Sequence, residues 1–352
     1  MAIFPSMAGG KLTAESTPST MADVAARAGV GIGTVSRVLN GSAQVSARTR
    51  AKVMEAIEEL SYVLVRPAGK ERSDQGGYVG VVIPDFGSPS SSQRLVGLVA
   101  ALRVGGANAV IYPVNNPDDA RATLMELPRN RSLDGLIVMS LPLRGEDGER
   151  LAGARFPVVL LDTWHTDLAR VTIDDVAGGR LATKHLIDLG HTRIAFVGEP
   201  ARNPMSFVTS VHREEGFDEA LAKGGIPRNP RYVRHAPHLR SAARQMGTEL
   251  LALATPPSAV VAASDTQAVG VLEAARASGR SIPQQLSVIG YDDIELASLV
   301  GLTTVRQPLE ASGLRAAEIL LGAIEGGQKP QSFNDTLPLE LVVRESTGRP
   351  PK

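Results

Sequence analysis

The feature that most constrains the fold is an alternation of short apolar runs with stretches of helical periodicity, which starts at Tyr78 and covers most of the chain. Buried strands that alternate with helices form parallel sheets with helices on both faces. The runs are YVGVVIPD, ANAVIYPV, DGLIVMS, FPVVLLD, RIAFVGEP, SAVVAASD and LSVIGYDD, and helices are predicted near residues 92–104, 176–189, 213–223, 241–253, 266–278 and 310–325. The alternation therefore predicts an α/β domain of doubly wound parallel sheets.

Acidic side chains follow four of these apolar runs. Asp85 follows VVIP, Asp162 follows VVLL, Asp265 follows VVAAS and Asp292 follows VIGY. Doubly wound sheets bind their ligands beyond the carboxyl ends of the strands. We therefore expect a ligand site at this edge of the sheets.

A glycine-rich stretch near the start of the chain, GVGIGTVSRVLNG, admits two interpretations. A loop that cradles a phosphate needs a preceding strand and suitably placed glycines. Here Thr34 follows Gly33, and the last glycine of G-x-G-x-x-G is absent. The preceding TMADVAARA has helical character, and no Lys-Ser/Thr pair follows it. The context therefore excludes a phosphate-binding loop.

The same stretch is typical of a turn between two short helices. Thr20 is expected to cap the first helix with Asp23 as its capping-box partner, and Gly29 supplies the left-handed residue that ends it. The three helices are predicted over about residues 21–28, 32–40 and 46–60, and their buried side chains are Val24, Ala25, Ala28, Val35, Val38, Leu39, Val53, Ile57 and Leu60. This arrangement is a helix-turn-helix, whose second helix enters the major groove of DNA.

Composition sets wider limits. At 352 residues and 43% hydrophobic content, the chain has material for two or three domains with large cores. The absence of cysteine excludes disulfides, thiolate metal sites and a cysteine nucleophile. No apolar run approaches a membrane span, and residues 1–19 lack the apolar core of a secretory signal. We therefore expect a cytoplasmic protein without a membrane segment, and a disordered tail over residues 1–19.

Signals for catalysis or metal binding are weak. The aspartate pairs at 174–175 and 292–293 are poor acid–base couples, because neighbouring residues on a strand point to opposite faces. No third ligand accompanies His235 and His238, and the histidines of KHLIDLGH flank a helix end, where structural or capping roles are expected. No G-x-S-x-G motif appears. The sequence thus predicts no catalytic residue, no metal and no cofactor.

The segment MADVAARAGVGIGTVSRVLNGSAQVSARTRAKVMEAIEELSY closely resembles the DNA-binding headpiece of the lactose-repressor (LacI/GalR-type) family of bacterial transcription regulators. The resemblance implies a headpiece over residues 20–62. Arg37 suits either two acceptors on a guanine edge or a phosphate, and both readings stay open. The DNA-contacting residues implied are Ile32, Gly33 and Arg37 toward the bases, Thr34, Ser36 and Asn40 toward phosphates, and Thr20.

Two departures from the family pattern affect this headpiece. Ile32 and Gly33 offer no hydrogen-bonding side chain at the base-reading positions, so we expect a preference that rests on Arg37 and on apolar contact of Ile32 with a thymine methyl. In the linker, residues 63–77, Glu71 stands where the family has a leucine that wedges into the minor groove. An acidic wedge is physically unfavourable, and we expect a flexible tether that kinks the operator less.

The remainder resembles the family's effector domain, which is related to periplasmic sugar-binding proteins, through KHLIDLGHTRIAFVG, VIGYDDIELA, LTTVRQP and LELVVRESTG. The resemblance implies two doubly wound lobes with a ligand between them, joined by three crossovers near Asp174, Gln307 and Asn334. The effector domain then covers residues 78–349, with lobe 1 at about 78–173 and 307–333, and lobe 2 at about 174–306 and 334–349.

The same resemblance implies a set of effector-binding residues. Carboxylates and a guanidinium suit the paired hydroxyls of a sugar. Trp164, Phe207 and Phe86 offer aromatic faces, although a packing role for Trp164 is equally open. Thr163 departs from the arginine that is common in the family after VVLLD. The expected set is Asp85, Ser88, Trp164, Phe207, Arg213, Asp265 and Asp292.

Together these observations predict a cytoplasmic, nucleoid-associated repressor that binds a palindromic operator as a homodimer and responds to a small-molecule effector, a sugar. The dimer surfaces implied by the resemblance are the helices near 92–104 and 266–278. No heptad tail follows RESTG, so a coiled-coil tetramer is not expected. The alternative is a sugar-binding protein without DNA function, and salt-sensitive DNA binding separates the two.

Overall fold

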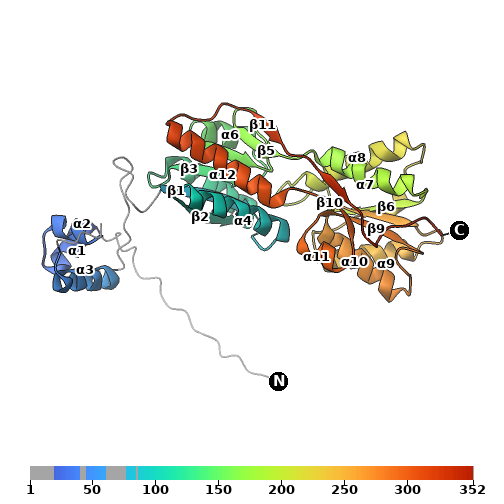
Figure 1. Ribbon diagram of the computed structural model, residues 1–352, viewed down its shortest axis with the longest axis horizontal. Coiled ribbons are helices and arrows are strands. Elements are labelled where there is room, and N and C mark those ends of the chain that lie inside the picture. Colours follow the sequence, from blue (N-terminus) through green and yellow to red (C-terminus); the bar gives the residue numbers. More distant parts are fainter. Residues whose placement is uncertain (1–19, 40–44, 61–76, 85, 352) are drawn as a thin grey trace, which may run out of the picture. The chain divides into compact units, whose positions relative to one another are not determined.

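The computed structural model describes residues 20–39, 45–60, 77–84 and 86–351, and the chain divides into two compact units, residues 1–67 and 68–352 (Figure 1). Each unit is described by itself. The predicted tail, Asn40 and most of the linker lie outside the described residues, and so does Asp85. The interpretations that rest on those positions therefore stay predictions, including the one that the linker with Glu71 kinks the operator less.

The first unit contains three helices, α1 (Met21–Ala28), α2 (Ile32–Leu39) and α3 (Ala47–Glu59). The predicted capping box is confirmed: the Thr20 amide donates to the Asp23 carboxylate at 2.7 Å, and the Asp23 amide donates to the Thr20 hydroxyl at 3.3 Å. Gly29 ends α1 with φ of 65°, the left-handed region that glycine occupies without strain.

A small core holds these three helices together. Val24, Val35 and Val53, one from each helix, are completely buried in it. Val30, the residue in the corner between α1 and α2, packs against this cluster as predicted. The tight corner and the shared core fix the angle between the two helices, and this confirms the helix-turn-helix.

The second unit contains two six-stranded sheets, which confirms the predicted fold class of doubly wound, mainly parallel sheets in two lobes. In the first lobe the strands lie in the order β11-β5-β4-β3-β1-β2, and every pairing is parallel. The helices α4 and α12 pack against each other in this lobe (Figure 1). The elements are β1 (Gly77–Pro84), α4 (Pro89–Val104), β2 (Ala107–Val114), α5 (Pro117–Glu126), the 3₁₀ turn Leu127–Arg129, β3 (Gly135–Met139), α6 (Gly145–Ala152), β4 (Val158–Leu161), β5 (Ala169–Thr172), α12 (Leu309–Gly326) and β11 (Asn334–Thr336).

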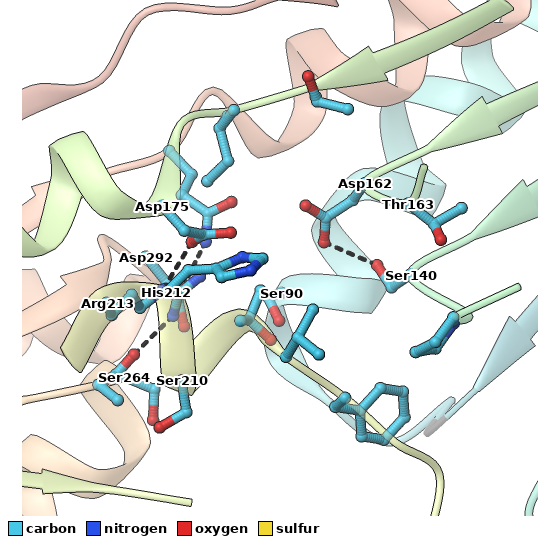
Figure 2. A pocket seen from close by; sticks show the side chains of 18 of the residues that line it. Ser90, Ser140, Asp162, Thr163, Asp175, Ser210, His212, Arg213, Ser264 and Asp292 are labelled. Atoms are coloured by element: carbon cyan, nitrogen blue, oxygen red, sulfur yellow. Dashed lines mark hydrogen bonds and ion pairs between the residues drawn. The ribbon is translucent and has the colours of Figure 1, made fainter. Parts of the chain in front are cut away.

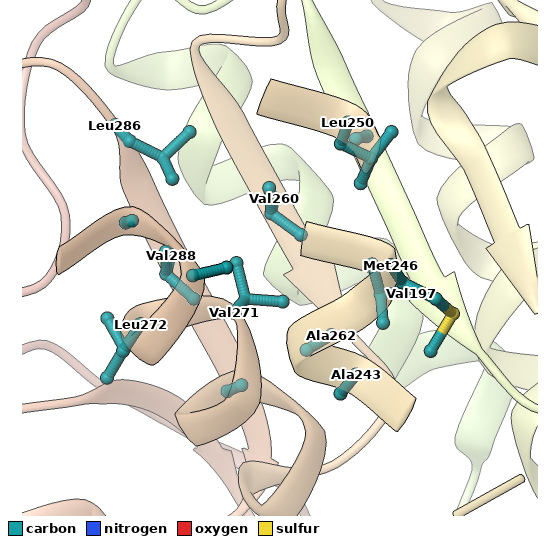
Figure 3. Packing of buried hydrophobic residues seen from close by; sticks show 14 of the residues in the cluster. Val197, Ala243, Met246, Leu250, Val260, Ala262, Val271, Leu272, Leu286 and Val288 are labelled. Carbon is teal, nitrogen blue, oxygen red and sulfur yellow. The ribbon is translucent and has the colours of Figure 1, made fainter. Parts of the chain in front are cut away.

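The second lobe has the strand order β12-β10-β9-β8-β6-β7, in which only the β10–β12 pairing is antiparallel among the described strands. Figure 3 shows side chains of α9 and α10 closing over β6, β8 and β9, with Val197, Met246, Val260 and Val271 in the apolar layer. The elements are α7 (Asp175–Asp188), β6 (Ile194–Gly198), α8 (Thr209–Lys223), the 3₁₀ turn Pro230–Tyr232, β7 (Val233–His235), α9 (Arg240–Leu251), β8 (Ala259–Ala262), α10 (Asp265–Ala277), β9 (Ser287–Asp292), α11 (Glu295–Leu299), β10 (Thr303–Arg306) and β12 (Glu340–Val342).

The chain crosses between the lobes three times. The first crossing lies between β5 and α7 and the second between β10 and α12, at the predicted places. The third corrects the sequence prediction, because Asn334 still belongs to the first lobe. There β11 pairs with β5, and the Thr172 hydroxyl donates to Asn334 Oδ1 at 2.7 Å. The crossing therefore follows Thr336 and precedes β12.

Candidate functional site

The candidate DNA-reading surface lies on α2. The helix begins after Gly31, whose carbonyl accepts hydrogen bonds from the amides of Thr34 at 2.8 Å and Val35 at 3.2 Å. Ile32 is 53% exposed although it is large and apolar, and Arg37 is exposed on the following turn. A large apolar side chain displayed beside a cation has no role in the core of this unit, which favours a surface that meets a partner.

Gly33 shapes this surface through its missing side chain. A Cβ placed on Gly33 would lie 3.9 Å from Nη2 of Arg37, so the guanidinium lies along the helix over the glycine. Thr34 and Ser36 are half-buried, and Thr20 is exposed with its hydroxyl donating to Asp23 at 2.6 Å. The predicted DNA contacts of these residues stay predictions, and Asn40 lies outside the described residues.

A cleft of about 750 Å³ lies in the second unit and is lined by both lobes and by the crossover segments. The residues that follow β3, β4, β6 and β8, together with the last residue of β9, contribute to its walls. This position at the carboxyl ends of parallel strands is the one expected for a ligand site. Figure 2 shows Asp162 and Ser140 on the first-lobe wall opposite Asp175 and Arg213 on the second.

On the first lobe, the strand ends are held in an unusual backbone conformation. Ser140 after β3 has φ of 49° and Asp162 after β4 has φ of 56°, and the Ser140 hydroxyl donates to the Asp162 carboxylate at 2.9 Å. The buried Arg94 of α4 approaches the same Asp162 Oδ2 at 3.2 Å. Left-handed conformations of residues other than glycine cost about 1–3 kcal/mol each and cluster at functional sites.

On the second lobe, Arg213 is the central group. Its Nε donates to Asp175 Oδ1 at 2.8 Å, its Nη1 donates to the Ala263 carbonyl at 2.5 Å, and Nη1 lies 3.5 Å from Asp292 Oδ1. The guanidinium also stacks 3.7 Å from the centre of the Tyr291 ring. An arginine held on so many sides keeps one orientation, and it fixes the two carboxylates at the floor of the cleft.

The electrostatics of this cluster follow from its burial. Burial raises the pKa of Asp175 and of Asp292 above the ordinary value, and the positive charge of Arg213 opposes that rise. Burial acts to lower the pKa of Arg213, but Asp175, Tyr291 and Asp292 together raise it. Arg213 therefore stays charged and is the counter-ion of both carboxylates.

The helices α7 and α8 approach closely enough to place these residues because glycines face each other. A Cβ on Gly179 of α7 would collide with the Arg213 carbonyl, and a Cβ on Gly216 of α8 would collide with the Val176 carbonyl. The bare glycines let the two backbones touch. This contact brings Arg213 of α8 next to Asp175 in the first turn of α7.

Gln307, on the second crossover, connects the two lobes. Nη2 of Arg94 donates to Gln307 Oε1 at 2.6 Å, and Gln307 Nε2 donates to Asp292 Oδ1 at 2.6 Å. The result is a continuous polar chain from one wall of the cleft to the other. We call it the inter-lobe network: Asp162, Arg94, Gln307, Asp292, Arg213 and Asp175.

The structure brings together most of the predicted effector residues. Ser88, Trp164, Phe207, Arg213 and Asp292 all line the cleft. Trp164 is 58% exposed and carries Arg170 at 5.2 Å from its ring centre, so it has both a stacked face and an exposed surface.

Asp265 is a correction. It is fully buried outside the cleft lining, where it accepts from the Thr304 hydroxyl at 2.6 Å and the Ile294 amide at 2.9 Å. These two donors replace any ligand, and burial raises its pKa well above the ordinary value. The carboxylate therefore holds α10 to β10 and the start of α11. Phe86 is 52% exposed and does not line the cleft either.

Sequence reasoning missed several residues of the network. The sequence places Asp162 at the strand edge where the ligand site is expected, but the predicted effector set does not include it. Arg94 lies within α4, and Gln307 lies between a strand and a helix. No local sequence pattern marks either residue as part of a ligand site. The prediction that Asp175 lies on a strand is wrong, because Asp175 begins α7 directly after the N-cap Asp174.

Three of the histidines have partners within the protein. His191 is buried between the hydroxyls of Ser258 at 2.9 Å and Ser287 at 3.1 Å, and His185 contacts the Thr347 hydroxyl at 3.0 Å. His235 lies 2.6 Å from Glu214. Within the part of the chain that the structure describes, no group of three or more His, Asp or Glu is arranged for a metal ion, and no helix is long and apolar enough to cross a membrane.

The helix-turn-helix and the two-lobed domain with a polar cleft define a class, the ligand-responsive DNA-binding regulators. A family description for bacterial regulatory proteins of the lacI family matches residues 20–63, and one for a periplasmic binding protein-like domain matches residues 183–347. The HTH-type transcriptional regulator CelR of Thermobifida fusca is 34% identical over 338 residues, covering 93% of this chain and 98% of CelR. The chain therefore belongs to the lacI family of bacterial regulatory proteins, and it is a DNA-binding transcriptional regulator.

Solved structures agree with this assignment. A complex of the transcriptional regulator CelR with cellobiose has a TM-score of 0.68 and 33% identity, and the match covers 93% of this chain and 99% of that chain. The Lac repressor dimer bound to operator and the anti-inducer ONPF has a TM-score of 0.69 and 29% identity, with 94% and 100% covered. The predicted family and the predicted fold class are both confirmed.

Proposed function

We propose that this regulator is a repressor that binds a palindromic operator as a homodimer, and that a sugar in the inter-lobe cleft changes its affinity for that operator. The observation that carries the proposal is the inter-lobe network. It lines the ligand cleft and also ties the lobes together through Gln307, so a ligand that contacts it acts on the arrangement of the lobes.

The lining of the cleft supports a sugar. Hydroxyl groups both donate and accept hydrogen bonds, and carboxylates and guanidinium groups offer complementary partners for neighbouring hydroxyls. Trp164 and Phe207 add aromatic surface for the apolar face of a sugar ring. CelR, which shares the fold, has been solved with cellobiose in complex.

The same network gives a route for regulation. A ligand shifts a conformational equilibrium only through its different affinity for the two states. Hydroxyls placed between Asp162 and the Arg213 cluster contact both lobes at once, and they favour the arrangement in which both walls reach the ligand. Gln307 lies on a crossover segment that connects the two lobes. A change in its hydrogen bonds therefore acts on the connection about which the lobes move relative to each other.

At the other end of the chain, α2 supplies the groups for reading DNA. Two headpieces in a two-fold dimer meet half-sites about one helical turn apart, which requires a palindromic operator. Arg37 is the hydrogen-bonding side chain at the exposed base-reading positions, and Ile32 provides apolar contact. We further propose that the protein acts in the cytoplasm and does not transform the ligand that it binds.

The experiment combines selection of DNA with a sugar response. Sites are selected from random duplexes, and fluorescence anisotropy then measures operator affinity with and without each of a panel of neutral mono- and disaccharides. We expect one sugar to change the affinity by about 5–150-fold, the usual range of allosteric coupling.

One variant and one control locate this effect. Trp164→Ala removes a lining residue that is 58% exposed, and we expect it to weaken the response while it leaves operator affinity without sugar intact. Arg228→Met, at an exposed arginine outside the cleft, is the matched control and keeps the full response. If the protein binds its operator with the same affinity in the presence of every sugar tested, the proposal of a sugar effector is overturned.

A further inference from the structure

The charges that line the cleft are unbalanced. Among the described lining residues, six carboxylates face two guanidinium groups, and lysine is absent from the lining. The carboxylates come from both walls: Asp162, Asp174, Asp175, Glu199, Glu215 and Asp292. A ligand in this cleft therefore enters a site with an excess of negative charge.

Neither guanidinium group compensates for this excess. Arg94 is 4% exposed and lies between Asp162 at 3.2 Å and Gln307 at 2.6 Å. Arg213 is 7% exposed and serves Asp175, Asp292 and the Ala263 carbonyl. Both cations are committed to the protein's own acceptors, and an anionic ligand gains a counter-ion here only by breaking a buried ion pair.

Two of the lining carboxylates, both on the second lobe, have no arginine partner among the described residues. Glu199 is half-buried after β6, and Glu215 is exposed on α8, two residues after Arg213. Within the described part of the chain neither forms an ion pair, in contrast to Glu214 and Glu219 of α8, which have arginine partners. Among the described residues neither has a paired cation within 4 Å to offset its contribution to the potential in the cleft.

We propose, on the basis of the sugar-effector function above, that the cleft selects an uncharged sugar and rejects sugars that carry a phosphate or a carboxylate. Hydroxyl groups satisfy carboxylates and hydrogen-bonded arginines without bringing charge. A phosphate brings one to two negative charges close to Asp162, Glu199 and Glu215 and finds no unpaired cation. Allowing for solvent screening, we expect a phosphorylated sugar to bind at least about tenfold more weakly than its neutral counterpart.

The test compares matched pairs by isothermal titration calorimetry on the full chain. Cellobiose is compared with 6′-phosphocellobiose, glucose with glucose 6-phosphate, and ribose with ribose 5-phosphate. The double variant Glu199→Gln with Glu215→Gln removes two charges while it keeps the shapes, and Glu295→Gln, an exposed residue outside the cleft on the same lobe, is the control. Each protein is measured at low and at high salt.

The expected result is that the neutral member of one pair binds, and that its preference over the phosphorylated member shrinks several-fold in the double variant and in high salt but not in Glu295→Gln. A phosphorylated member that binds equally or more tightly overturns this inference and leaves the sugar-effector function standing. A preference that is unchanged in the double variant also overturns it, because the lining carboxylates are then not its cause. If no sugar of either kind binds, the proposed function itself fails.

Discussion

Replacement of Arg213 by methionine tests whether the cluster at the floor of the cleft is held by one buried cation. The substitution leaves the carboxylates of Asp175 and Asp292 with side chains that are 9% and 8% exposed and without their counter-ion. Removal of one partner from a buried ion pair lowers stability by about 3–5 kcal/mol, because it leaves the other charge buried without a counter-ion. We expect the free energy of unfolding of the second unit to fall by about that amount at neutral pH.

The loss depends on pH, and the sign follows from the two carboxyl groups. Burial already raises their pKa values, and the loss of Arg213 removes the largest of the contributions that oppose that rise, so that Arg94 and, at Asp292, Gln307 remain. An acid whose pKa is higher in the folded than in the unfolded protein destabilises the fold while it is ionised, and this cost disappears as pH falls through the folded-state pKa. The deficit of Arg213→Met relative to the unmodified chain should therefore shrink on acidification.

Urea unfolding at fixed protein concentration measures the deficit, because Trp164 is the single tryptophan of the chain and reports on the second unit. Adding Asp175→Asn to Arg213→Met should restore part of the stability, since it removes one of the two uncompensated charges. Arg228→Met is the control, with its partly exposed surface pairs, and should change stability by less than about 1 kcal/mol. A deficit for Arg213→Met that is as small as the control's, or that is the same at every pH, refutes the reasoning.

Three further predictions follow from local features of the two units. Gly179→Val should lower the free energy of unfolding of the second unit by about 1–3 kcal/mol in urea, since the valine side chain has to displace the Arg213 backbone. Gly322→Ala is the control, because a Cβ there meets nothing within 4 Å, and it should be neutral or stabilising. Equal effects of the two substitutions would contradict the close-contact argument. Ile32→Ala should relax one thymine preference in sites selected from random DNA, and an unaltered site would show that Ile32 does not read a base. Burial lowers the pKa of His191, so the contribution of the neutral imidazole to stability should be present at high pH and be lost as pH falls below the ordinary histidine value of 6.5. His191→Asn should remove this part of the pH dependence of the free energy of unfolding. An unchanged pH profile would show that another group causes that dependence.

The elements that local sequence determines were predictable. The capping residues Thr20 and Asp23, the left-handed Gly29 and the long apolar strands each carry their signal within a few residues. The short elements were not, because β11 is the polar triplet NDT, whose pairing with β5 depends on residues far away in the chain. That missing signal displaced the third crossover.

The candidate site shows the same limit. In the sequence Asp265 and Asp292 both follow an apolar run, yet Asp292, the last residue of β9, faces the cleft while Asp265, the first residue of α10, turns inward to the Thr304 hydroxyl. The choice depends on which donors the fold brings within reach. The hydrogen bond from Arg94 to Gln307 joins residues 213 positions apart, and neither residue lies in a pattern that predicts it.

The most direct test of the account is a reciprocal binding measurement on the full chain. Sugar affinity is measured by calorimetry with and without saturating operator, and operator affinity is measured by anisotropy with and without saturating sugar. Because coupling between two sites is reciprocal, we predict that both experiments give the same factor and that this factor differs clearly from one. A sugar that binds in the cleft with the same affinity whether or not operator is present would contradict the claim that the cleft controls DNA binding.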